Sequence, residues 1–272
     1  MYVNAGMVNN HGLELELGWK DNIGDFSYGI DANLATLKNK VMEGLSTSRI
    51  GEQMVGGESV AFFEAGYPLW YLRLYEIESI DQQTGDPVYA QHDDNPALND
   101  DDRIYAGKPF PDFTYGATIN LGWKGFDFII YGAGSQGLQR LLAYTRQDQI
   151  SNNQLKEFVT DAWTSPSSTG YKHPKPQNSN TILASTDRIY DASFFKIKQI
   201  QLGYTVPRRI CNYAKLSTVR AYVSFDDWFT FTKYPGIDPE LSGFSRSSSG
   251  LAVDSGSYPI SKKLVFGLNI AF

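Results

Sequence analysis

The chain has 272 residues, 42% hydrophobic and 20% charged, so it carries enough apolar material for one large β domain or two ordinary domains. The formal net charge of -6 gives no overall basic surface for nucleic acid, and the single Cys211 excludes an internal disulfide framework. No window approaches the roughly 18 apolar residues of a membrane helix. The opening residues MYVNAGMVNNHG lack the pattern of a signal peptide, so we expect either a protein kept inside the cell or an N-terminus that lies further upstream.

Alternation of apolar and polar residues dominates residues 13–36. Leucine or tryptophan at every second position from Leu13 to Trp19 is separated by glutamate or glycine, and the same alternation resumes at Phe26. Alternate side chains of a strand point to opposite faces, so each run predicts a strand with one apolar face. Residues 21–24 between the runs predict a hairpin turn.

Two further strands are expected before residue 80. Residues 67–77, YPLWYLRLYEI, predict one of them, and a shorter strand is expected at 59–64 with a turn at 65–68. The shorter strand is needed if every tight turn is to lie at the same end of the sheet, because an even number of strands must then separate the first hairpin from the second.

The second hairpin is predicted from residue 113 onwards. Residues 113–123 alternate strictly, and the chain reverses at Lys124 and Gly125 into FDFIIY. The glycines that follow, Gly132, Gly134 and Gly137, match the G-x-G-x-x-G pattern of dinucleotide-binding folds. That pattern belongs in parallel βαβ units, whereas a tight reversal makes an antiparallel pair, so we expect the glycines to shape the exit into a long loop.

A change of phase marks the strands of the C-terminal third. Phe195 and Ile197 hold one phase and Ile200 and Leu202 the other, which predicts a β-bulge near Lys198. Strict alternation would place Asp227 on the apolar face of the next strand, so we expect it at the rim or turned inward by a bulge. The last strand runs to the C-terminal Phe272 and is apolar at every second position from Leu264.

Short turns alternate with long polar connections near residues 80–110, 138–191 and 233–257. Outer-membrane barrels are built in this way, with short periplasmic turns and long extracellular loops. The fold class predicted is therefore all-β, an antiparallel transmembrane β-barrel portion of about nine strands. Nine strands predict a part of a barrel, because single-chain bacterial barrels have even strand numbers.

The chain contains five blocks that carry a family resemblance: NHGLELELGW, DDDRIYAGKPFPDFTYG, FFKIKQIQLGYTVP, FTFTKYPGIDPE and SYPISKKLVFGLNIAF. In this order they resemble the C-terminal barrel region of the SusC/RagA family of TonB-dependent outer-membrane transporters, over essentially the whole chain. The resemblance implies a 22-stranded plugged barrel, of which residues 1–272 would be the C-terminal part without the plug, the TonB-interacting segment and the first strands. It also implies a place in the outer-membrane lipid and import of glycans or peptides with a SusD-like lipoprotein and TonB.

Several residues are candidates for binding or assembly. Family members often carry an acidic, glycine-containing turn before the DDDR block, and here the matching stretch lacks the glycine of a tight calcium loop. Resemblance to outer-membrane proteins implies that the terminal strand is read by the barrel-assembly machinery. The residues concerned are Asp93, Asp94, Asn95, Asp100 and Asp102 for a weak calcium site; Phe266, Leu268, Ile270 and Phe272 for the assembly signal; and the loop aromatics Trp163, Tyr171, Phe244 and Tyr258 for contact with a ligand or with the lipoprotein.

No catalytic constellation is predicted, and no cofactor. Glu14 and Glu16 lie two apart on one strand and are interpreted as solvated wall residues rather than as an acid and base pair. The three histidines, His11, His92 and His173, show no zinc-ligand spacing. The alternative to a transporter segment is a soluble β-sandwich carbohydrate-binding module, which the length of the strands at 113–123, 217–231 and 260–272 disfavours.

Overall fold

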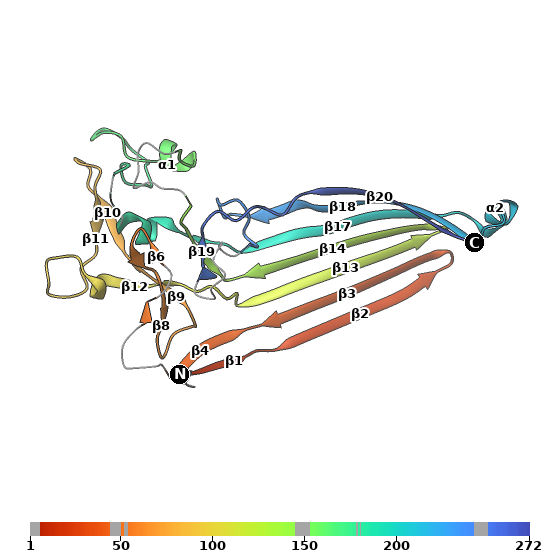
Figure 1. Cartoon of the computed structure of the whole chain (residues 1–272), viewed down its shortest axis with the longest axis horizontal. Helices are drawn as coiled ribbons and strands as arrows, with labels where there is room; N and C mark the ends of the chain where they lie inside the picture. The colour runs from red at the N-terminus through yellow and green to blue at the C-terminus, as the bar shows by residue number, and fades with distance from the viewer. Residues whose placement is uncertain are drawn as a thin grey trace.

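The computed structural model describes residues 6–43, 50–51, 54–144, 153–177, 179, 181–241 and 250–272. Seven long strands form one antiparallel sheet, and neighbours in the sheet are consecutive long strands of the chain (Figure 1). In sheet order they are β2 (Glu14–Ile23), β3 (Phe26–Thr36), β13 (Phe113–Trp123), β14 (Phe126–Gln136), β17 (Phe194–Thr205), β18 (Thr218–Thr232) and β20 (Lys263–Ala271).

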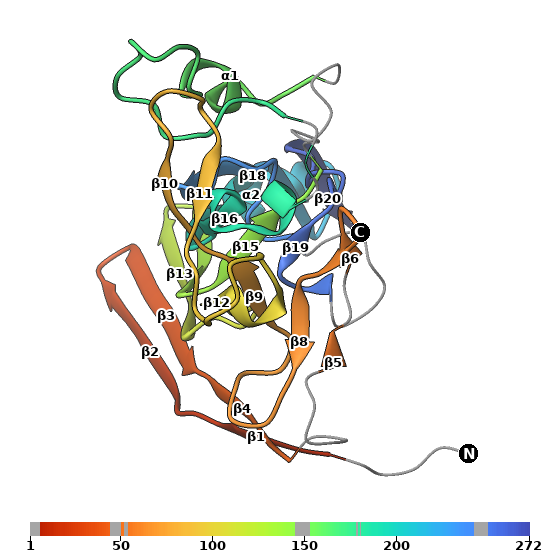
Figure 2. The same ribbon diagram turned by 90° about the vertical axis from the view of Figure 1, so that its left-hand side faces the viewer.

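The long connections lie at one end of this sheet and build a lobe there, whereas the short turns, the helix α2 (Arg208–Tyr213) and the C-terminus lie at the other end (Figure 1). Viewed from the lobe, the sheet is a curved wall with β2 and β3 at one side and β18 and β20 at the other (Figure 2). The strands of the lobe and its margin are β1 (Met7–His11), β4 (Lys38–Glu43), β5 (Ile50–Gly51), β6 (Met54–Val55), β7 (Glu58–Ser59), β8 (Ala61–Phe63), β9 (Tyr71–Tyr75), β10 (Ile77–Ile80), β11 (Pro87–Tyr89), β12 (Arg103–Gly107), β15 (Gln139–Leu142), β16 (Ile189–Asp191) and β19 (Val253–Asp254).

The lobe, and not the long sheet, contains the buried core. Its largest cluster joins Leu72 and Leu74 of β9 to Leu141 of β15 and to Ile182, all with no exposed surface. The helices of the lobe are short: α1 (Glu157–Thr160) and three 3₁₀ turns at Asp100–Asp102, Thr181–Ala184 and Thr186–Arg188. None of the helices in the described ranges is long and apolar enough to cross a bilayer.

The two strands predicted at 59–64 and 67–77 do not belong to the long sheet. The predicted count of about nine is therefore wrong, and the described part of the chain contributes seven strands to this sheet. Residues 61–63 and 71–75 instead form β8 and β9 of a small sheet in the lobe, and β3 pairs directly with β13. All five residues of β9 are buried, because the lobe covers both of its faces. Within the described residues, no strand of the long sheet lies between the first and the second hairpin. Their tight turns can still lie at the same end, because zero is also an even number.

The phase change is as predicted, and the glycine motif lies in an antiparallel setting as predicted, although only Gly137 lies at the exit from the strand. Gly132 and Gly134 lie within β14, which pairs antiparallel on both sides, and Gly137 with φ of 80° leads into another strand rather than a helix. Against β14, the register of β17 slips between Ile197 and Gln199, so Lys198 is the extra residue of a bulge. Against β17, the strand β18 in turn carries one extra residue between Asp226 and Phe229. Opposite it, Asp227 adopts φ of 58° and turns toward Lys198, which confirms the inward option.

Candidate functional site

The outer face of the long sheet is apolar and exposed across all seven strands. The strand register places Ile30, Ile119, Ile130 and Ile200 side by side on four neighbouring strands. On the two outermost strands, Leu17 is 62% exposed and Leu268 is 63% exposed. Soluble monomers seldom expose an apolar surface of this extent, which therefore marks a contact with lipid or with another apolar surface.

Aromatic rings border this apolar face at both ends. Toward the turns, Phe26, Trp123, Phe126 and Tyr204 follow one another across four strands. Toward the lobe the corresponding row contains Tyr115, Phe195 and Phe231, of which the first two stack at 6.0 Å between ring centroids and the last two at 6.2 Å.

Gly134 makes the second row possible, since a Cβ atom there would lie 2.6 Å from the Tyr115 ring. Eight residues separate the two rows along β13, which is roughly 27 Å along the strand and about 20 Å across a membrane at the usual tilt. Two aromatic rows that far apart match the girdles of outer-membrane barrels, which sit at the two membrane interfaces.

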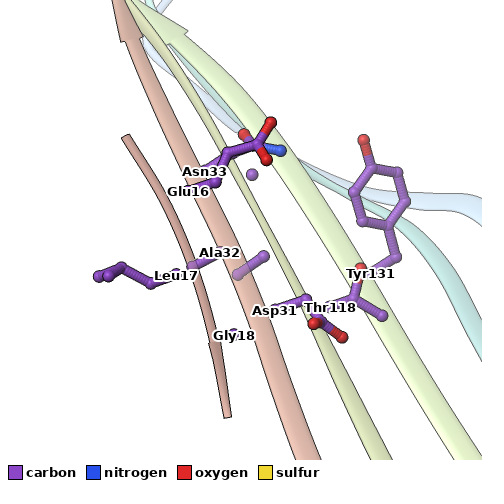
Figure 3. A pocket seen from close by; sticks show the side chains of 10 residues that line it. Glu16, Leu17, Gly18, Asp31, Ala32, Asn33, Thr118 and Tyr131 are labelled. Atoms are coloured by element: carbon purple, nitrogen blue, oxygen red, sulfur yellow. The ribbon is translucent and has the colours of Figure 1, made fainter. Parts of the chain in front are cut away.

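The inner face of the same strands is polar. A hollow of about 360 Å³ lies over β2, β3 and β13, where Gly18 and Gly116 leave room between larger side chains. Figure 3 shows Glu16, Asp31 and Thr118 at this hollow. Glu14 and Glu16 are both exposed on this face, in agreement with the wall-residue interpretation. A solvated polar wall on one side and an apolar wall on the other is the arrangement of a water-filled membrane barrel.

A cluster of ion pairs ties the lobe to the inner face at the bulge. The ammonium of Lys196, which is 3% exposed, lies 2.6 Å from Asp238 Oδ1 and 3.0 Å from Glu240 Oε2. Lys198 lies 2.6 Å from the other oxygen of Glu240 and 3.4 Å from Asp227 Oδ1. Burial opposes ionisation of Glu240, but hydrogen bonds from Lys198 and Lys196 outweigh it and lower the pKa of that carboxyl. The segment after β18 is thereby fixed to β17.

The acidic loop does not gather its oxygens into a cation site. Asp102 accepts the backbone N–H of His92 and of Asn99, both at 2.8 Å, and these bonds hold the pKa of its carboxyl below the ordinary value. Asp100 accepts a hydrogen bond from the Arg73 guanidinium at 2.9 Å. The Asp93 carboxylate accepts the backbone N–H of Asn95 at 2.9 Å. No group of three or more acidic, histidine or cysteine side chains in the described ranges could hold a metal ion.

The loop aromatics predicted to contact a ligand occupy different surroundings. Trp163 donates its Nε1–H to the Gln82 carbonyl at 3.1 Å, and the Tyr171 hydroxyl donates to the Gln82 side chain at 2.6 Å, so both pack on the same turn. Tyr258 is 84% exposed. Phe244 lies outside the described residues.

The lobe contains a group of stacked tyrosines that was not predicted from the sequence. Tyr67 and Tyr71 stack at 4.5 Å and Tyr71 and Tyr105 at 5.6 Å, beside a pocket of about 260 Å³ that Arg73 also lines. Tyr71 is buried, and burial together with Glu64 raises the pKa of its hydroxyl. The density of tyrosine in YPLWYLRLY was the available signal, but these residues were assigned to a strand of the long sheet.

Comparison with known proteins places the chain among large receptors, although no family model matches it. It is 30% identical to TonB-dependent receptor P3 of Formosa agariphila, over 99% of this chain and 29% of that protein. It is 23% identical to TonB-dependent receptor SusC of Bacteroides thetaiotaomicron, over 100% of this chain and 27% of that protein.

A solved structure of the RagAB peptide transporter shares the fold, with a TM-score of 0.80 and 23% identity over 99% of this chain and 30% of that one. The same fold recurs in the RagAB peptide importer in its closed-closed state, with a TM-score of 0.79 over 99% of this chain and 30% of that one, at 22% identity. The chain thus spans less than a third of the relatives that it matches. The chain is thus similar along its whole length to TonB-dependent receptors, SusC among them, and corresponds to one part of a larger receptor of that kind.

Proposed function

We propose that this chain forms part of the wall of a plugged β-barrel in the outer membrane, and that the receptor containing it imports nutrients. The observation that carries the proposal is the two-sided sheet: its apolar, aromatic-bordered face is exposed, its other face is polar, and the long connections all lie at one end. A soluble β-sandwich module is disfavoured, because its apolar face would be covered by a second sheet.

The receptor proposed here has more strands than this chain. An open edge in lipid leaves backbone groups unpaired, so β2 and β20 are proposed to pair with further strands of a 22-stranded barrel that encloses a plug. Residues 1–272 are then the C-terminal part of the barrel. The proposed partners are a SusD-like lipoprotein on the lobe and TonB, which would act on a segment outside this chain. Glycans or peptides are the proposed substrates, with Trp163, Tyr171 and Tyr258 as candidate contacts.

Single cysteines on β20 test which face meets lipid. In a receptor carrying Cys211→Ser, Leu268→Cys and Asn269→Cys place thiols on opposite faces of the same strand. After labelling with bimane and reconstitution with brominated lipids, the label at position 268 is expected to be strongly quenched and the label at position 269 much less. Equal quenching at both positions would contradict the assignment of the faces.

The terminal strand is proposed to carry the assembly signal, with Phe266, Leu268, Ile270 and Phe272 on the lipid side. Deleting Phe272 is expected to lower the amount of receptor at the cell surface without changing the substrate affinity of the receptor that does assemble. Tyr213→Ala is the matched control, since this ring is 93% exposed and the Phe272 ring 92%. Surface levels that stay unchanged after the deletion would argue against a role in assembly.

A further inference from the structure

Basic residues continue the outer face of the sheet just beyond its apolar band. β1 and β4 extend the β2–β3 hairpin toward the lobe in the same register, with His11 opposite Lys38 as Leu15 is opposite Leu34. The alternation therefore carries His11, Lys38 and Lys40 onto the outer face, where all three are exposed.

The joint between the two parts of the hairpin is tight. A Cβ atom on Gly12 would lie 1.9 Å from the Thr36 carbonyl oxygen, so only glycine fits there. The Leu13 N–H also donates to Thr36 Oγ1 at 2.9 Å, and the Thr36 N–H donates to the Leu13 carbonyl at 2.9 Å. The basic residues are thus held at a fixed height, immediately past the end of the apolar band.

These residues line a pocket of about 390 Å³ on the lobe side of the band. Its opposite wall is the chain around residues 66–68 and 108–112, which is bonded to β4 through Gly66 N–H to the Val41 carbonyl and Val41 N–H to the Tyr67 carbonyl, each at 2.9 Å. Lys108 contributes a third ammonium, and Pro68 and Phe110 contribute apolar surface.

The pocket is positively charged. Asp112 is the one carboxylate in its lining, and it accepts a hydrogen bond from Lys108. Within the described ranges, Lys38 and Lys40 have no carboxylate within 4 Å. Two lysines and a histidine are therefore left to face an anion, at the level where the apolar face ends.

We propose that this pocket binds the phosphate group of a lipid headgroup in the outer leaflet, a reading that rests on the proposed function. The apolar face directly below, beginning at Leu13 and Leu15, would contact the acyl chains of the same lipid, while the lysines neutralise its phosphate. A free phosphate has no acyl chains, so the apolar face below the pocket would add nothing to its binding free energy. The lipid is thus favoured over a free anion as the occupant.

The test compares lipid binding by the receptor that contains this chain and by charge-neutralised variants. Diphosphoryl lipid A in nanodiscs is the probe. Lys38→Gln, a change at an exposed side chain, is expected to weaken its retention about fivefold, and the triple variant Lys38→Gln/Lys40→Gln/Lys108→Gln about a hundredfold. Lys124→Gln/Lys215→Gln, at the turn end of the sheet, is the matched control and is expected to retain the lipid as the unmodified receptor does.

Three results would contradict the lipid site, its occupant or the proposed function. Unchanged retention in the triple variant, with the receptor still in the outer-membrane fraction and still heat-modifiable in its mobility, would overturn the site and leave the proposed function standing. Displacement of lipid A by an equal concentration of inorganic phosphate would overturn the lipid as the occupant. Absence of the unmodified receptor from the outer-membrane fraction would overturn the proposed function and this site with it. Dephosphorylated lipid A is expected to bind the unmodified receptor as weakly as lipid A binds the triple variant.

Discussion

Replacing Leu17 by arginine is expected to destabilise the receptor by about 2–4 kcal/mol, whereas the same replacement at Leu13 is expected to cost about 0–1 kcal/mol. Both side chains lie on the outer face of the first hairpin and both are exposed, at 62% and 79%. The strand register puts Leu17 beside Ala32, within the band between the aromatic rows, and puts Leu13 at the lobe end of that band. An arginine at the first position would thus lie in hydrocarbon and at the second near the interface.

Comparing the two variants distinguishes a sheet that faces lipid from a sheet that faces water. On the surface of a soluble protein, arginine at either exposed position would change the free energy of unfolding by about 0.5 kcal/mol or less. The free energy of unfolding is measured by urea titration of the receptor in lipid vesicles, with the heat-modifiable band as the readout of the folded barrel. Equal and small effects of Leu17→Arg and Leu13→Arg would remove the ground for placing this face in lipid.

Replacing Lys196 by methionine is expected to destabilise the receptor by about 3–5 kcal/mol, because it leaves a buried carboxylate without its counterion. Asp238 is 7% exposed and lies 2.6 Å from the Lys196 ammonium. Methionine preserves the length and apolar stem of lysine, so the loss of charge dominates the effect. The Asp238 carboxylate also accepts the Glu240 N–H at 3.0 Å, so the turn after β18 is expected to loosen with it.

Two further variants identify the cause of that effect. Lys20→Met removes an exposed partner 3.9 Å from Asp31 and is expected to cost less than about 1 kcal/mol. Adding Asp238→Asn to Lys196→Met is expected to restore part of the stability, since the buried group then carries no charge. Urea titration and the rate of proteolysis within residues 233–262 measure both effects. A double variant no more stable than Lys196→Met alone would show that the unpaired charge is not the cause.

The same ion cluster gives the stability a definite pH dependence. A carboxyl whose pKa is lowered by folding contributes stability above its unfolded value, and that contribution is lost as the pH falls through the folded value. For Glu240, whose ordinary value is 4.5, the contribution of its pairs with Lys196 and Lys198 is therefore present at neutral pH and declines only below pH 4.5.

Alternation along the sequence by itself determined the seven long strands, their two faces, the hairpin turns and the bulge at Lys198. The reason is local: each of these strands separates an apolar from a polar environment, so the difference between its two faces recurs at every second residue of the chain. For Asp227 the sequence left two options, the rim or an inward turn, because a charge on the apolar face would break the pattern.

The fold of the lobe and its contacts with the sheet were determined only by the tertiary structure. The residues of β9 are buried on both faces and show no alternation that distinguishes a short lobe strand from a long wall strand, which is why residues 67–77 were misassigned. The pair of Lys196 with Asp238 joins residues 42 positions apart, and the tyrosine group joins Tyr71 to Tyr105. Such contacts depend on how each long connection folds back over the end of the sheet, which alternation along a single strand does not encode. The acidic loop follows the same rule, since its carboxylates bind backbone N–H groups and Arg73 instead of converging on a cation.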